Sequence, residues 1–312
     1  MWLLLAAVSA VSAGLVSVTV KAGMKNVDSN LGTFLRTLVV LIFTFVMVLI
    51  VGSLNSISNI KPLEWVFIVA SGLCTGFSWL CYFKALQTGD INKVVPVDKL
   101  STVLTMILAI TILGEQYWWL TFAAMAVMVV GTMLMIDKKK DPLKARETGI
   151  DEAADIAAAQ TEGTSRRNWF KSNLWLVLAI LSLVFASFAG ILAKLGMESI
   201  DSNLGTFLRT VIVALMAFFI VLGRKTLPAV KKMTRKNWIF LVVSGVLTGI
   251  SWLCYYGAMQ TGDVSVIVPI DKLSILVSIT FSYFLFKEKL SIKAFIGLIL
   301  LTGGTLLLLI KP

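Results

Sequence analysis

The ten residues at positions 28–37, Asp-Ser-Asn-Leu-Gly-Thr-Phe-Leu-Arg-Thr, recur without change at positions 201–210. The same offset relates segment 78–82 to 251–255, segment 87–90 to 260–263 and segment 96–101 to 269–274. Residues 1–139 therefore align with residues 174–312 without a gap. Self-similarity at one fixed offset indicates repeated structural units, so we expect two copies of one fold.

The composition places both copies in a membrane. Of the 312 residues, 58% are hydrophobic and only 14% are charged, and the mean hydropathy is +0.90. Soluble domains are about one quarter charged. Each copy holds five apolar runs near the ~20 residues that a helix needs to cross a bilayer. We therefore predict an all-α polytopic membrane protein, embedded in the lipid bilayer, with ten transmembrane helices near 2–22, 31–52, 64–86, 93–113, 117–136, 175–195, 204–223, 237–259, 266–286 and 291–310.

The repeat divides the chain into three parts: a five-helix repeat at 1–136, a charged soluble linker at 137–173 and a second repeat at 174–312. Because five is odd, a second copy joined through a soluble linker enters the membrane from the opposite side, which makes the two repeats inverted. Basic residues concentrate in the linker, in the loop at 224–236 and in the turn at 287–293. The positive-inside rule then predicts a cytoplasmic linker and external termini. We also expect the chain to lie in the plasma membrane of a bacterium or archaeon.

The residue inventory opposes several classes of function. The chain has no histidine, and its three cysteines, Cys74, Cys81 and Cys254, lie singly in apolar runs. It therefore lacks the commonest general base and zinc ligand. We expect no catalytic residues, no metal and no cofactor, and thus no enzyme. The net charge of +11 could suggest nucleic acid, but the topology of the loops explains the same basic residues, so we expect no nucleic-acid partner.

Charged residues within the predicted spans are the first candidates for function, because each costs at least ~2.5 kcal/mol at mid-helix. Those that recur with the repeat are Lys21, Arg36, Asp98 and Lys99, and their equivalents Lys194, Arg209, Asp271 and Lys272. Lys21, Arg36 and Asp98 are expected near one face, and the inverted copy places its trio near the other, as two alternating gates require. The alternative is structural: the lysines snorkel, the arginines pair with Asp28 and Asp201, and Asp98 pairs with Lys99 or a neighbour.

Polar and aromatic side chains form stripes beside these charges. Ser71, Thr75, Ser78 and Tyr82 share one helix face, and the offset repeats them in the second copy. Hydroxyl groups that face lipid would lack partners, so we expect the stripes to face the interior. The further candidates on this basis are Trp79, Ser101, Trp252, Tyr255 and Ser274. Packing or anchoring at the interface is the alternative for the tryptophans.

The combination resembles the EamA-type repeat of the drug/metabolite transporter superfamily. The resemblance rests on Lys21 closing the first helix, Arg36 opening the second, the Pro96 to Ser101 segment and Gly114-Glu115 before the fifth. It covers both copies, and it implies secondary transport of small metabolites, commonly export, through a basket made by the first four helices of each half. Two features depart from the family. The first helix lacks the acidic residue that small multidrug relatives use, and the loop charges place the termini outside.

We therefore expect a carrier of small polar or zwitterionic metabolites, such as amino acids or organic acids, that works by alternating access and exports them. Asp98 and Asp271 are the candidates for gating or for coupling to a proton or Na⁺, and the six basic residues for holding a substrate carboxylate or the gates. An uptake carrier or exchanger of the same fold is the alternative. A membrane-embedded transferase, a lipid-handling protein and a passive channel are alternatives of other classes. Substrate identity, direction, coupling ion and oligomeric state stay open.

Overall fold

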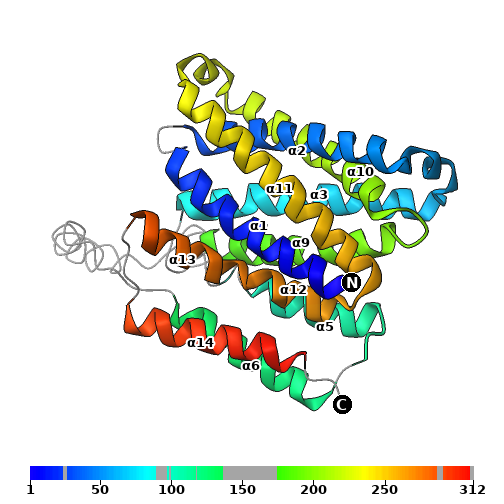
Figure 1. The fold of residues 1–312 in the computed structure, drawn as a ribbon, viewed down its shortest axis with the longest axis vertical. Helices are drawn as coiled ribbons and strands as arrows, with labels where there is room; N and C mark the ends of the chain where they lie inside the picture. The colour runs from blue at the N-terminus through cyan, green and yellow to red at the C-terminus, as the bar shows by residue number, and fades with distance from the viewer. Residues whose placement is uncertain are drawn as a thin grey trace, which may run out of the picture.

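The computed structural model describes residues 1–23, 27–88, 97, 100–116, 118–135, 174–286 and 291–309. The helices of the first copy are α1 (Trp2–Gly23), α2 (Ser29–Val51), α3 (Pro62–Thr88), α5 (Ser101–Ile112) and α6 (Trp119–Leu134). Those of the second copy are α9 (Leu174–Gly196), α10 (Ser202–Gly223), α11 (Arg235–Thr261), α12 (Val264–Lys272), α13 (Ser274–Phe286) and α14 (Ile292–Leu307). Short 3₁₀ helices, η1 (Ser53–Asn59) and η2 (Leu227–Lys232), join α2 to α3 and α10 to α11 (Figure 1). The linker, 137–173, lies outside the described residues.

The repeated ten-residue segment is a helix start. The Asp28 carboxylate accepts hydrogen bonds from the backbone N–H groups of Asn30 (3.1 Å) and Leu31 (3.0 Å), and Asp201 caps α10 through Asn203 (2.9 Å). An aspartate at this position satisfies amide groups that have no partner within the helix. The two carboxylates therefore accept hydrogen bonds from backbone N–H groups at the helix starts. No ion pair between them and Arg36 or Arg209 is seen in the described part of the chain.

Seven described segments are long and apolar enough to cross a membrane, which makes the chain a multi-pass membrane protein. Three more apolar helices, α5, α6 and α14, lie where spans are predicted but are shorter. The 16 residues of α6 extend about 24 Å, less than the ~30 Å of a typical hydrocarbon core. The expected count of ten full-length spans is therefore not reached within the described residues.

The ninth predicted span, 266–286, is divided. The structure ends α12 at Lys272 and begins α13 at Ser274, with Pro269 inside α12. A proline cannot donate the hydrogen bond that a helix expects from its position, which weakens the turn that contains it. The backbone N–H of Leu273 instead bonds the Ile270 carbonyl (2.9 Å), a tighter turn that separates the two halves of the span.

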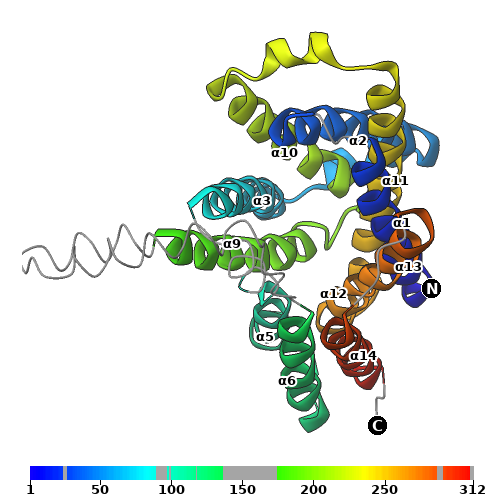
Figure 2. The ribbon, with the colours of Figure 1, turned by 90° about the vertical axis from the view of Figure 1, so that its left-hand side faces the viewer.

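Contacts between the two copies are reciprocal, as expected when two copies of one fold pack about a two-fold axis. Phe34 packs on Phe218, with ring centroids 5.7 Å apart, and their equivalents Phe207 and Phe45 pack together at 5.3 Å. An early residue of α2 thus meets a late residue of α10 and the reverse, so these equivalent helices run antiparallel. Figures 1 and 2 both show α2 beside α10, and α6 beside α14. Likewise α1 packs along α11, and α3 along α9.

Glycines make two of these crossings close. A Cβ atom added to Gly72 of α3 would lie 2.6 Å from the Cβ of Ile212 on α10. A Cβ atom added to the equivalent Gly245 of α11 would lie 2.6 Å from the Cβ of Val39 on α2. Glycine at these two positions therefore allows the helices to approach closely.

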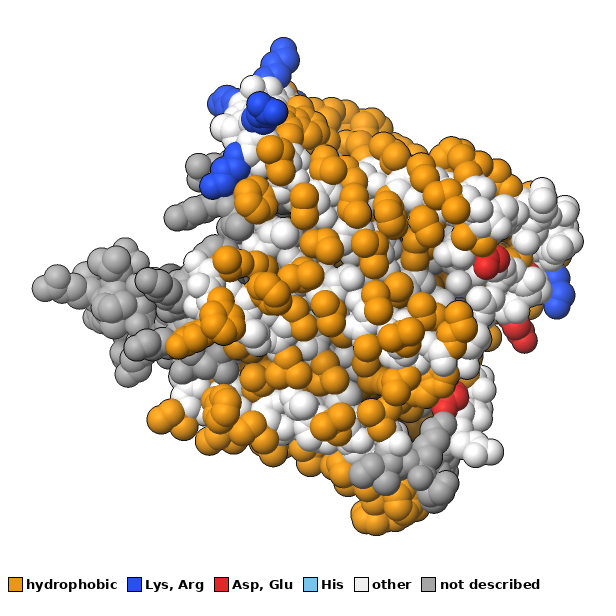
Figure 3. Space-filling model, in the orientation of Figure 1, with side chains coloured by type: hydrophobic (Ala, Val, Ile, Leu, Met, Phe, Trp, Pro, Cys, Tyr) orange, Lys and Arg blue, Asp and Glu red, His pale blue; other side chains and the backbone are white. Residues whose placement is uncertain are grey.

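The helix ends define two faces. We call the ends where α6 finishes and α9 begins the linker face, and the opposite ends, which carry η1 and the α5–α6 turn, the distal face. Exposed basic side chains gather on the linker face around η2, at the upper left of Figure 3, and they include Arg224, Lys225, Lys231, Lys232, Arg235 and Lys236. Orange apolar side chains cover much of the surface between the two faces, as expected of a surface in contact with lipid.

Candidate substrate pathway

A buried arginine of the second copy bonds a helix of the first copy. Arg209 of α10 is only 5% exposed. Its Nε donates to the Ser71 hydroxyl (2.8 Å) and its Nη2 to the Thr75 hydroxyl (2.5 Å), both on α3. The guanidinium also lies 4.7 Å from the ring centre of Tyr256 and 5.8 Å from that of Trp252. Hydroxyl groups and aromatic faces thus stabilise this cation, and no carboxylate within 4 Å does so in the described residues.

The equivalent arginine has a different environment. Arg36 is partly exposed, and no described residue gives it a hydrogen bond or an ion pair. The hydroxyls equivalent to those at Arg209 bond their own helix instead: Ser244 donates to the Leu241 carbonyl (2.9 Å) and Thr248 to the Ser244 carbonyl (2.7 Å). Arg209 is therefore bonded to the two hydroxyls of the other copy, whereas the equivalent Arg36 is not bonded to the equivalent hydroxyls of Ser244 and Thr248.

Asp271 belongs to a hydroxyl network in the interior. The Ser9 hydroxyl of α1 donates to Asp271 Oδ1 (3.1 Å) and lies 3.1 Å from the Ser251 hydroxyl of α11. The equivalent pair, Ser78 and Ser182, is 3.2 Å apart. Ser9, Ser78, Ser182 and Ser251 are all buried. Ser9 therefore joins α1 to α12 through the Asp271 carboxylate and to α11 through the Ser251 hydroxyl.

A third cluster fastens the distal face. Lys194 donates to the Gly262 carbonyl (2.6 Å) and lies 3.7 Å from Glu115 Oε1. Glu115 also accepts the backbone N–H groups of Val264 (2.6 Å) and Ser265 (2.8 Å), which begin α12. A carboxylate at this end complements the helix dipole. The cluster therefore ties α9, the α5–α6 turn and α12 together.

Other bonds between the copies lie on the same face. Glu64 of α3, 4% exposed, accepts from the backbone and hydroxyl of Ser199 (3.1 and 2.5 Å). Ser53 donates to Asp201 (2.7 Å). On the linker face the equivalent of Asp201 is Asp28, which caps its own helix through the N–H groups of Asn30 and Leu31, and the equivalent of Glu64 is Asn237, whose amide oxygen accepts from the backbone and hydroxyl of Thr234.

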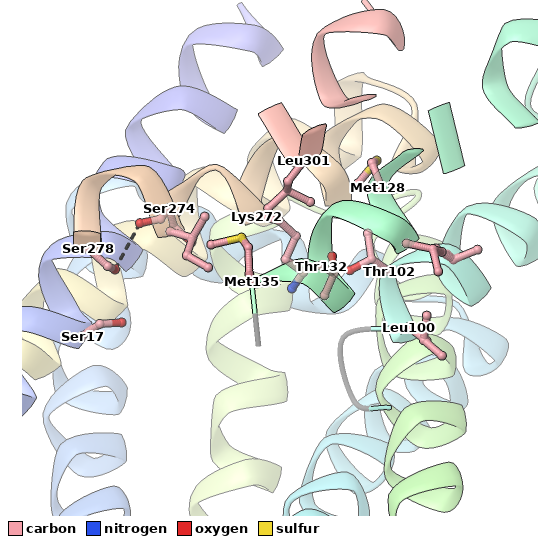
Figure 4. A pocket seen from close by; sticks show the side chains of 13 residues that line it. Ser17, Leu100, Thr102, Met128, Thr132, Met135, Lys272, Ser274, Ser278 and Leu301 are labelled. Atoms are coloured by element: carbon pink, nitrogen blue, oxygen red, sulfur yellow. Dashed lines mark hydrogen bonds between the residues drawn. The ribbon is translucent and has the colours of Figure 1, made fainter. Parts of the chain in front are cut away.

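A cavity of about 390 Å³ occupies the linker half of the molecule. Its walls come from the later residues of α1 and α6, the beginnings of α5 and α13, the end of α12 and the middle of α14. Lys272 reaches into it, and in Figure 4 its amine ends between Met135 and Thr132. The lining residues are Ser17, Leu100, Thr102, Val103, Met128, Val129, Thr132, Met135, Lys272, Ser274, Ile275, Ser278 and Leu301.

The predicted residues thus separate into several places. Arg209 and Trp252 meet in one cluster, where the ring centroids of Tyr255 and Tyr256 are 5.2 Å apart. Lys194, Arg209 and Asp271, expected as one gate, bond different partners. The remaining candidates lie elsewhere.

Lys272 and Ser274 line the cavity. The Ser101 carbonyl accepts a hydrogen bond from the Ser187 hydroxyl (2.9 Å). Trp79 lines a small recess beside α2, and Tyr82 packs near Ala179. Asp98, Lys99 and the Lys21 side chain lie outside the described residues.

Several residues of these networks were missed in the sequence, among them Glu64 and Ser199. Ser9 recurs as Ser182, so the repeat could have identified it. Glu115 recurs as Glu288 but was assigned only to the turn. Tyr256 corresponds to Phe83, so the repeat gives no signal for its hydroxyl-bearing ring.

Comparisons with known proteins agree with the two-copy architecture. The family described as "EamA-like transporter family" matches residues 1–137 and 173–310. A relative from Sinorhizobium sp., "Uncharacterized transporter in cobO 3'region", is 34% identical over 137 residues, which are 44% of this chain and 97% of the relative. That relative therefore has about the length of one repeat. A solved structure titled "Crystal structure of protein" is similar in fold, with a TM-score of 0.71 at 15% identity, over 98% of this chain and 96% of that one.

Proposed function

Because the chain belongs to the EamA-like transporter family of the drug/metabolite transporter superfamily, we propose that it is a secondary carrier whose inverted halves alternate access across the membrane. In this proposal all ten apolar segments cross the bilayer. The antiparallel packing of the equivalent helices α2 and α10 supports inversion, because one copy then crosses in the opposite direction to the other.

The observation that carries the proposal is the unequal state of the two arginine sites. In an inverted repeat, one gate is closed when its equivalent is open. On the distal side, Arg209 is bonded to α3, and two further contacts, Lys194–Glu115 and Glu64–Ser199, join the helix ends. On the linker side, Arg36 has no bond to any described residue, and the cavity lies in this half of the molecule. The structure then corresponds to a state closed at the distal face. In the opposite state Arg36 bonds Ser244 and Thr248, and Arg209 is released.

Asp271, with Asp98 as its equivalent, is proposed to couple the transition to a proton or Na⁺. Protonation of Asp271 would remove the charge that Ser9 stabilises, and so would change the balance between the two states. The lysines and arginines exceed the acids among the candidate residues, which favours a small organic acid or amino acid as substrate.

The loop charges support a proposed orientation in the membrane, and the proposed direction rests on it. The basic linker face is proposed to be cytoplasmic, in the plasma membrane, so that the cavity loads from the cytoplasm and the carrier exports. Uptake or exchange is the alternative, and a measurement of the direction of flux distinguishes it from export. The transferase alternative would require a bound divalent metal, and no group of three metal-ligating side chains occurs within the described residues.

The test is export from bacteria that produce the native chain, Asp271→Asn or the double variant Asp98→Asn/Asp271→Asn. Untargeted mass spectrometry compares metabolites inside and outside the cells. We expect one class of small acids to accumulate outside with the native chain, and the Asn variants to reduce this efflux about tenfold or more. Glu198→Gln is the matched control, because Glu198 is an exposed acid on the distal face. Equal efflux by Asp271→Asn and the native chain would make Asp271 a structural residue.

A further inference from the structure

We propose that the 390 Å³ cavity binds a small carboxylate that has an aliphatic tail and no ammonium group, with Lys272 holding the carboxylate. The inference rests on the proposed transport function and narrows its substrate from acids and zwitterions to acids alone. The cavity is large enough for this purpose, because small-molecule sites begin at about 300 Å³.

The charge of the cavity requires an anion. Lys272 is the one ionisable side chain among the described lining residues, and no carboxylate lies within 4 Å of its amine in the described part of the chain. An ammonium group that is partly removed from water and has no counter-ion is unfavourable. A ligand carboxylate supplies both the missing charge and acceptors for the three N–H donors of the lysine.

Hydroxyl groups are positioned to assist. Thr102 and Thr132 line the same cavity, and no described group forms a hydrogen bond with either hydroxyl. Ser278, in contrast, already donates to the carbonyls of Gly14 and Ser274, at 3.1 Å each. The two threonines can therefore donate to the carboxylate oxygen that Lys272 does not hold.

The rest of the lining selects the tail. Most of the other side chains are aliphatic or thioether groups, among them Met128, Met135, Ile275 and Leu301, and no aromatic ring lines the cavity among the described residues. Methionine adapts to irregular aliphatic shapes. A ligand ammonium would find no described carboxylate here and would meet the like charge of Lys272. The cavity therefore discriminates against amino acids of the same carbon skeleton.

The experiment measures equilibrium binding of radiolabelled 4-methylpentanoate to the purified full chain in lipid nanodiscs. Competitors are leucine, which adds an α-ammonium to the same skeleton, 4-methylpentanamide, which removes the charge, and oleate, a lipid-derived carboxylate. Variants are Lys272→Met, Lys272→Arg and Lys293→Met, the last removing an exposed lysine outside the cavity. Thermal unfolding of each variant confirms folding.

We expect saturable binding of 4-methylpentanoate, with leucine and the amide competing about tenfold or more weakly. Lys272→Met should abolish binding, Lys272→Arg should retain part of it, and Lys293→Met should leave it unchanged. Equal competition by leucine, unchanged binding to folded Lys272→Met, or no saturable binding to the native chain would overturn the proposal. Binding of oleate alone would also overturn it and assign the cavity to lipid.

Counterflow in proteoliposomes separates this inference from the proposed function. One outcome is binding that depends on Lys272 but no counterflow of 4-methylpentanoate or of the exported acids. This result would contradict the carrier function and would still support the binding site. Counterflow of an exported metabolite by a folded Lys272→Met chain would contradict the site and leave the carrier.

Discussion

At the scale of single residues, Arg209 depends on two hydroxyl groups. Its guanidinium is buried, and Ser71 and Thr75 are the hydroxyls it bonds. Hydrogen bonds to a charged group each contribute about 1.5–3 kcal/mol, and a buried donor left without a partner is costly. The two hydroxyls therefore contribute to the stability of the fold.

The double variant Ser71→Ala/Thr75→Val is therefore expected to lower the free energy of unfolding by about 2–4 kcal/mol. Thermal or denaturant unfolding in detergent measures the change. The repeat supplies the control, Ser244→Ala/Thr248→Val, whose hydroxyls bond only their own helix here and should cost less than about 1 kcal/mol. Equal losses in the two double variants would show that the arginine contacts contribute nothing specific.

The sequence identified the residues of this site better than their partners. The hydroxyl stripes are buried, which confirms that they face the interior. This could be predicted because the helical period and the polarity of the side chains are sufficient to identify a buried polar face. The pairing of the arginines with Asp28 and Asp201 was wrong, because those carboxylates cap the starts of the same helices, about two turns earlier. Which residues meet Arg209 depends on how α3 crosses α10, and no local pattern specifies a crossing.

At the scale of helices, the crossings at Gly72 and Gly245 leave no room for a methyl group. Either Gly→Ala change forces a Cβ within 2.6 Å of a branched side chain, and overpacking of this kind costs about 1–3 kcal/mol. We expect lower unfolding temperatures for Gly72→Ala and Gly245→Ala. Gly303→Ala is the control, since no heavy atom lies within 4 Å of its added Cβ and alanine favours a helix by about 1 kcal/mol. A Gly303→Ala chain as unstable as the others would contradict close packing as the cause.

Helix positions were largely predictable, and most observed ends lie within a few residues of the apolar runs. The division of 266–286 into α12 and α13 was not. Pro269 signalled a weak turn, yet the sequence does not specify whether a helix bends, breaks or opens at a proline. The hydrogen bond that Glu115 accepts at the start of α12 was also not predictable, because it is a tertiary contact between residues 149 positions apart in the sequence.

At the scale of the whole molecule, the two faces are expected on opposite sides of the membrane. Ser58 in η1 and Lys231 in η2 are equivalent under the repeat, and both are exposed. In a background without the native cysteines, Ser58→Cys should react with an impermeant maleimide in intact cells. Lys231→Cys should react only after the membrane is opened. The reverse pattern would place the linker outside the cell, and labelling of both in intact cells would contradict opposed faces.

The interleaving of the two copies also has a consequence for biogenesis. The principal partner of α1 is α11, and their bonded residues Ser9 and Ser251 are 242 residues apart in the chain. At about 5–20 residues per second on the ribosome, α1 waits roughly ten to fifty seconds for that partner to be synthesised. During this interval its buried serines face whatever the bilayer and the insertion machinery offer. The first half therefore cannot complete its native packing during its own translation, and the early helices wait in the membrane for partners from the second half.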